Sequence, residues 1–192
     1  YEGKELSEDK PIQFIVPEKG EEMVYPLSQH IGAPAKPLVA KGDQVLKGQI
    51  IAEAGGFISA NVLSSVSGTV KGIEPRLVAN GAMVQSIIVE NDGEENAIEG
   101  FGNARDYTKL SKEEIRNIIK EAGIVGLGGA GFPTHVKLTP KDEAAIDHVI
   151  VNGAECEPYL NSDYRVSGTD YRRTESDPSV VRQCQGNHRH RE

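Results

Sequence analysis

The sequence predicts a mixed α and β protein (α+β), in which a β-rich domain precedes the start of an α/β domain. Three observations predict it: a set of short β segments that repeats once, a helix with its own capping signal, and a β-branched run after that helix. With 192 residues, 38% of them apolar, the chain is long enough for one substantial core or two small ones. We therefore expect a globular chain with more than one structural unit.

An internal repeat marks the β-rich part. The segment VAKGDQV at 39–45 is echoed by VANGAMV at 78–84, and each copy is followed by an Ile-Ile pair and then a glutamate. Glycines at matching places supply tight turns between the β segments. Two similar halves of short strands are typical of a barrel-sandwich hybrid, the fold of biotinyl and lipoyl carrier domains. We assign it to residues 36–90.

Carrier domains of this fold present a modifiable lysine on the hairpin that joins the two halves. Here that segment, which we call the connecting hairpin, comprises residues 54–62 and contains no lysine. The sequence therefore favours a structural or docking module over a lipoyl or biotinyl carrier.

The remaining segments follow from capping signals and polarity. Residues 1–35 are proline-punctuated and are interpreted as an arm with one short strand at 12–16, and residues 91–110 as a polar linker. Ser111 and Glu114 have the spacing of a capping box, and Gly123 has the place of a helix C-cap. Residues 146–151 are a β-branched run suited to a buried parallel strand.

A glycine-rich segment follows the helix and is the most informative part of the chain. Five glycines fall within residues 123–131, which we call the glycine loop, and Lys137 comes shortly after them. Such a backbone can approach a ligand closely and turn several amides toward one anion, and a lysine adds a mobile positive charge. A cofactor that bears a phosphate is implied.

Two better-known phosphate motifs do not fit this loop. Residues 126–131 match the pattern of the dinucleotide fingerprint, but that motif follows a strand and opens a helix, whereas this one follows a helix and meets Phe132-Pro133 at once. A P-loop would end in Gly-Lys-Ser/Thr, which is absent here.

The loop sequence GGAGFPTHVK at 128–137 and the sequence VNGAECEPYL at 151–160 carry a resemblance. They resemble the flavin- and NADH-binding subunit of respiratory complex I, and more closely the C subunits of Rnf-type electron-transport complexes. The resemblance covers about residues 1–165. It implies a partial FMN- and NADH-binding α/β domain at 111–165 and an NADH-linked flavin oxidoreductase whose complex couples electron transfer between NADH and ferredoxin to ion translocation.

Carried over by position, the resemblance implies which residues hold the cofactors. The FMN side comprises Gly126, Gly128, Gly129, Gly131, Lys137, Asn152 and Glu155, and the NADH side comprises Phe132 and Glu157. Neither a catalytic triad nor a Cys-His pair is evident. The implied reaction does not need one, because the flavin itself supplies the reactivity. Relative to complex I, Ala154 replaces an aspartate and His135 replaces a glycine, which predicts a weaker hold on FMN.

The cysteine count bears on the clusters that the resemblance implies. The only two cysteines, Cys156 and Cys184, cannot make the four-thiolate set of a 4Fe-4S cluster or a structural zinc site. Clusters are therefore expected in the full-length protein and not on ligands of this chain. Cys156 lies between two glutamates, whose charges disfavour a reactive thiolate, so we interpret it as structural.

The last residues depart from the pattern. Five of nine arginines fall among residues 166–192 and apolar residues are sparse there, which predicts a disordered or artificial tail. Because the remaining walls of the flavin pocket are expected beyond residue 165, we expect the chain alone to be inactive.

Charge and hydropathy narrow the setting. A net charge of −8 argues against nucleic acid as a partner, and no apolar run approaches the length of a membrane span. The resemblance implies other Rnf subunits and ferredoxin as partners, on the cytoplasmic face of the cell membrane. Two alternatives stay open: a flavin and iron–sulfur reductase of the cobalamin-reductase type, and a non-catalytic carrier or docking module.

Overall fold

The computed structural model describes residues 16–182, except 105, 128–129, 147–148 and 152–179. The chain divides into two compact units. Residues 16–141 make up the first unit. The described residues of the second fall within 142–151 and 180–182.

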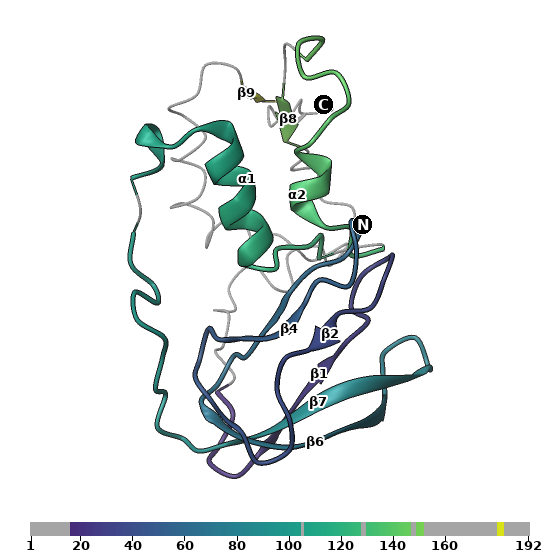
Figure 1. Cartoon of the computed structure of the whole chain (residues 1–192), viewed down its shortest axis with the longest axis vertical. Coiled ribbons are helices and arrows are strands. Elements are labelled where there is room, and N and C mark those ends of the chain that lie inside the picture. The colour runs from purple at the N-terminus through teal and green to yellow at the C-terminus, as the bar shows by residue number, and fades with distance from the viewer. Residues whose placement is uncertain (1–15, 105, 128–129, 147–148, 152–179, 183–192) are drawn as a thin grey trace, which may run out of the picture. The chain divides into compact units, whose positions relative to one another are not determined.

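The first unit is built on two antiparallel sheets (Figure 1). One sheet has the order β1-β7-β6-β3, formed by Glu22–Pro26, Met83–Asn91, Gly68–Leu77 and Gln44–Val45. The other has the order β2-β4-β5, formed by Lys36–Pro37, Ile50–Glu53 and Val62–Leu63. Because β3 from the first half of the repeat pairs with β6 from the second, the two halves interlock. The expected barrel-sandwich hybrid is confirmed.

The repeated glycines do form turns. Gly42 and Gly81 both have positive φ, +97° and +83°. At the second turn the amide of Val78 donates to the carbonyl of Ala82 at 3.0 Å, so β6 runs into β7 through a closed five-residue connection. Positive φ is readily available only to glycine, which explains why the repeat keeps this residue in both copies.

A core of aliphatic side chains fills the space between the sheets. Ile51, Ile87 and Val89 are fully buried, and Tyr25 from β1 closes one side with 8% of its surface exposed. Burying one such aliphatic side chain contributes about 1.5–3 kcal/mol. Residues expected to form an arm thus supply a strand, because β1 pairs with β7 through Tyr25 and Ile87. The strand expected at 12–16 lies outside the described residues, apart from Val16.

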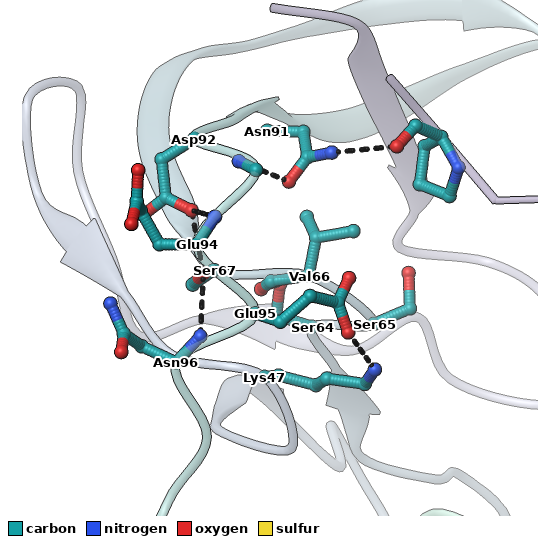
Figure 2. A network of polar contacts seen from close by, with 12 residues as sticks. Lys47, Ser64, Ser65, Val66, Ser67, Asn91, Asp92, Glu94, Glu95 and Asn96 are labelled. Atoms are coloured by element: carbon teal, nitrogen blue, oxygen red, sulfur yellow. Dashed lines mark hydrogen bonds and ion pairs between the residues drawn. The ribbon is translucent and has the colours of Figure 1, made fainter. Parts of the chain in front are cut away.

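A polar network joins the end of β7 to the turn before β6 (Figure 2). The hydroxyl of Ser67 donates to Asp92 at 2.6 Å and accepts from the amide of Asn96 at 3.0 Å. The Asn91 side chain donates to the carbonyls of Pro17 and Glu18. Residues at the beginning of the expected linker are therefore bound to the hybrid domain.

Helix α1, Lys112–Glu121, begins and ends as expected. Ser111 accepts from the amide of Glu114, whose carboxylate accepts from the amide of Ser111 at 2.7 Å. At the other end Gly123 adopts φ +63°, and the amides of Gly123 and Ile124 donate to the carbonyls of Lys120 and Ile119. This pair of bonds is a Schellman motif. The short helix α2, Thr134–Lys137, lies beside α1 (Figure 1).

The described residues of the second unit include a parallel pair of strands. β8, Val149–Val151, lies in the run expected to be a parallel strand and pairs with β9, Val180–Arg182. β9 falls within residues 166–192, for which a disordered or artificial tail stays a prediction. The sequence did not indicate this strand, because three residues carry little periodic signal and the partner strand lies far away in the chain.

Candidate functional site: the closed glycine loop

The glycine loop is closed at its base like a hairpin. Val125 and Pro133 form an antiparallel bridge, and the amide of Gly126 donates to the carbonyl of Phe132 at 3.0 Å. One residue outside this bridge, the amide of Thr134 donates to the carbonyl of Ile124, also at 3.0 Å. The loop therefore returns on itself after α1 and does not open a long helix, which agrees with its rejection as a dinucleotide fingerprint.

One side chain just after the loop is suited to an anion. The Lys137 side chain is exposed and forms no ion pair with any residue that the structure describes. Leu127, within the loop, is fully exposed as well. An exposed ammonium beside a glycine-rich segment can bind a phosphate group.

His135 in α2 occupies the position where the complex I sequence has glycine. Its pKa lies below the ordinary value, chiefly because partial burial disfavours the charged imidazolium, and also because the Lys120 ammonium lies near it. The backbone of Phe57, in the connecting hairpin, acts in the opposite direction.

The glycine loop touches the hybrid domain near its exit. The amide of Ile31 donates to the carbonyl of Ala130 at 2.8 Å. Gly131 has φ +58°, and a β-carbon there would come within 2.7 Å of the Gln29 carbonyl oxygen. Gly131 is thus required for the approach of two backbones, whatever its relation to a cofactor.

A pocket of about 280 Å³ lies under the loop's base. One wall comes from the hybrid domain and is formed by Tyr25, Gln29, His30 and residues 60–63. The other wall comes from the end of α1 and the start of the glycine loop and is formed by Ala122, Gly123 and Val125. None of the four expected cofactor residues that the structure describes lines it.

Four of the nine expected cofactor residues fall within the described structure, and two of them, Gly126 and Phe132, share a backbone hydrogen bond. Gly126, Gly131, Phe132 and Lys137 lie in or directly after the closed loop. Gly128, Gly129, Asn152, Glu155 and Glu157 lie outside the described residues, as do Ala154 and both cysteines. Their contacts with FMN and NADH stay predictions.

Sequence reasoning missed the residues of the hybrid domain that contact the loop. Asn61 donates from its side-chain amide to the Glu121 carbonyl at 3.3 Å. His30 is 9% exposed and forms hydrogen bonds through both ring nitrogens. A local sequence signal for either role is absent, because Asn61 and Glu121 lie 60 residues apart and His30 and Ala60 lie 30 residues apart.

Metal and membrane signals are absent within the described part of the chain. Among these residues no three His, Cys, Asp or Glu side chains gather closely enough to hold a metal ion. No described helix combines the length and apolar character needed to cross a bilayer.

A barrel-sandwich hybrid joined to a closed, glycine-rich loop is the architecture of a cofactor-binding module. Residues 1–94 match the family described as the RnfC barrel sandwich hybrid domain, and residues 119–173 match the Nuo51 FMN-binding domain. These matches make the chain similar to the N-terminal part of Rnf complex C subunits.

Curated relatives show the same similarity. The chain is 46% identical over 165 residues to the C subunit of the proton-translocating ferredoxin:NAD(+) oxidoreductase complex of Clostridium ljungdahlii, covering 85% of this chain and 35% of the relative. It is 43% identical over 166 residues to the C subunit of the Na(+)-translocating ferredoxin:NAD(+) oxidoreductase complex of Acetobacterium woodii, covering 85% and 36%. It is also 43% identical over 162 residues to the C subunit of the ion-translocating oxidoreductase complex of Pseudomonas aeruginosa, covering 83% and 20%. The chain thus spans little more than a third of these relatives at most.

Proposed function

We propose that this chain forms the FMN-holding part of an NADH-linked flavin oxidoreductase subunit. The subunit would belong to an Rnf-type complex that exchanges electrons between NADH and ferredoxin and couples this exchange to ion translocation. The names of the relatives from Clostridium ljungdahlii and Acetobacterium woodii support this activity, and the match of residues 119–173 supports FMN as the cofactor.

The observation that carries the proposal is the closed glycine loop with its exposed lysine. The bridge between Val125 and Pro133 fixes the two ends of the loop, and Lys137 follows within one helical turn. The donor set suits the FMN phosphate: a backbone that can turn its amides outward and a cation with no competing partner among the described residues.

The chain's own part in the reaction is binding and orientation. FMN, when bound, supplies the acceptor of hydride from NADH and the donor of single electrons. Lys137 and the amides around Gly128 and Gly129 would hold the phosphate and the ribityl chain. Asn152 and Glu155 would orient the flavin ring, while Phe132 and Glu157 would line the side from which NADH approaches.

The setting is part of the same proposal. Other Rnf subunits and ferredoxin would be the partners, and the subunit would lie peripherally on the cytoplasmic face of the membrane. Electrons would leave the flavin through 4Fe-4S clusters whose ligands are supplied by the full-length protein.

Flavin titration of the full-length subunit tests the proposal. Gly128→Val places a branched side chain where the backbone would approach the phosphate, and Lys137→Ala removes the cation. We expect Gly128→Val to abolish FMN binding and Lys137→Ala to weaken it about tenfold, since a hydrogen bond to a charged group contributes about 1.5–3 kcal/mol.

Gly72→Val is a matched control, because Gly72 lies in β6 without positive φ, and a β-carbon there would meet no atom within 4 Å. It should bind FMN like the unmodified protein. An unchanged FMN affinity in Gly128→Val would refute the assignment of the loop.

A further inference from the structure

Side-chain hydrogen bonds hold the connecting hairpin together and join it to Ala33, outside the hairpin. The hydroxyl of Ser59, fully buried, accepts from the amide of Gly55 at 2.9 Å and donates to the carbonyl of Ala33 at 2.8 Å. The side-chain oxygen of Asn61 accepts from the amide of Ala54, also at 2.9 Å. A hairpin that presents a carrier lysine must be free to reach its partners, whereas this one is fixed.

One end of the connecting hairpin contacts the entrance of the glycine loop. Asn61 donates to the Glu121 carbonyl at the end of α1. A β-carbon on Gly123 would collide with the backbone oxygen of Asn61 and would lie 3.0 Å from the side chain of Leu63. The loop's first residue is therefore pressed against the hairpin, and only glycine fits at this contact.

The exit of the glycine loop contacts a second segment of the hybrid domain, residues 29–31. Ile31 binds the carbonyl of Ala130, and Gly131 approaches Gln29 too closely for any side chain. Entrance and exit thus each have one glycine with positive φ that faces a backbone carbonyl of the hybrid domain.

His30 joins these two contact segments. Its Nε2 accepts from the amide of Ala60 at 3.1 Å, which leaves Nδ1 protonated to donate to the carbonyl of Ile31, also at 3.1 Å. The imidazole therefore links the hairpin that meets the loop's entrance to the segment that meets its exit. The distance between the two contacts depends on this side chain.

We propose that the hybrid domain acts as a platform that sets the geometry of the glycine loop, with Asn61 and His30 as positioning residues. The inference rests on the proposed function, in which that loop holds FMN. The platform determines the separation of the loop's ends and hence where its amides point. The connecting hairpin, which carries the prosthetic group in lipoyl and biotinyl domains, here supports the cofactor loop of the following domain.

Gly123→Ala in the full-length subunit is the principal test. The new methyl group separates the loop's entrance from Asn61, while Gly123 is not among the residues expected to contact FMN. We expect an FMN dissociation constant at least about tenfold higher. Gly81→Ala is the matched control, because Gly81 also has positive φ, +83°, and a β-carbon there meets no atom within 4 Å. It has the same backbone strain without the collision, and its FMN affinity should stay within about twofold of the unmodified protein.

Asn61→Asp separates the two roles of Asn61. A carboxylate still accepts from the amide of Ala54 but cannot donate to Glu121, so the hairpin stays bound while the contact with the loop is lost. Asn61→Asp should weaken FMN binding, and His30→Ala should weaken it as well by loosening the link between the contacts. A role limited to stability would lower the thermal midpoint of these variants and leave the FMN dissociation constant of the folded protein unchanged.

Hydrogen exchange makes the outcomes distinguishable without flavin. In Gly123→Ala, we expect faster exchange at the amides of Gly126 and Thr134, with β6 and β7 unaffected. If the unmodified protein does not bind FMN, the proposed function fails, and this exchange pattern still tests whether the hybrid domain positions the glycine loop. If the unmodified protein binds FMN and Gly123→Ala binds it equally well, the platform inference is overturned.

Discussion

Ser67 and Asp92, 25 residues apart in the sequence, are joined by a 2.6 Å hydrogen bond from hydroxyl to carboxylate (Figure 2). The same carboxylate oxygen accepts from the amide of Glu94 at 2.8 Å. Ser67 is 1% exposed, so its hydroxyl is oriented by the surrounding backbone. The pair connects the turn before β6 to the residues that follow β7.

Asp92→Asn should change the acid stability of the chain. The Ser67 hydroxyl, and then the Glu94 amide, hold the pKa of Asp92 below its ordinary value. Stabilisation by a carboxylate with a lowered pKa is complete above the unfolded pKa, about 3.9, and is lost as pH falls through the folded pKa. The thermal midpoint of Asp92→Asn should therefore lie below that of the unmodified chain at pH 7, and the difference should shrink below about pH 4. Glu99→Gln, at an exposed acid, is the control, and an equal difference at all pH values would contradict the prediction.

Tyr25→Phe should destabilise the hybrid domain. The phenol oxygen accepts from the amide of Ser65 at 3.0 Å and lies 2.8 Å from its hydroxyl. Loss of the oxygen leaves a partly buried amide without its partner, which costs about 1–3 kcal/mol. Urea unfolding followed by circular dichroism would measure this, with Ser65→Ala as the control that keeps the phenol's bond to the amide. Equal losses in the two variants would mean that the amide bond contributes nothing.

Ser111→Ala should loosen the first turn of α1. Removal of an N-cap hydroxyl costs about 1 kcal/mol, and the Glu114 carboxylate also loses a partner at 2.7 Å. Amide hydrogen exchange in the first turn should accelerate about fivefold. Ser111→Thr retains the hydroxyl and should exchange nearly as slowly as the unmodified chain. Similar rates in all three proteins would show that the capping box is not formed in solution.

His135 should titrate below about pH 6.5, the ordinary imidazole value. Partial burial and Lys120 both oppose its protonation. Because the folded pKa is lowered, this group's contribution to stability is present above the unfolded value and is lost as pH falls through the folded one. NMR titration of the imidazole would give the pKa, and Lys120→Ala should raise it. A midpoint at or above the ordinary value would contradict the assigned burial.

Local signals predicted the elements, and long-range contacts account for what sequence reasoning missed. The capping box at Ser111 and the C-terminal Gly123 are recognisable because each acts on residues within one or two turns. The strand β1 was not predicted, because Glu22–Pro26 ends in proline and gains its conformation by pairing with β7.

The candidate site was likewise predictable only in part from the sequence. Glycines beside a lysine were enough to predict an anion-binding loop. The same composition could not reveal that Gly123 and Gly131 face the hybrid domain, because their neighbours Asn61 and Gln29 lie about 60 and 100 residues earlier. A glycine required by a backbone contact and one required by a ligand are identical in the sequence.

Residues 96–98 are attached to the hybrid domain, which shortens the free linker between this domain and helix α1 with the glycine loop. Lys47 exchanges backbone hydrogen bonds with Asn96 and Ile98, and its ammonium lies 5.9 Å from the centre of the Phe101 ring. Only residues 102–110 then remain before the cap of α1, a span of at most about 30 Å when fully extended. So short a tether keeps the loop and its platform at an effective concentration on the order of millimolar. Contacts too weak to hold two separate proteins together can therefore keep the glycine loop in contact with the hybrid domain.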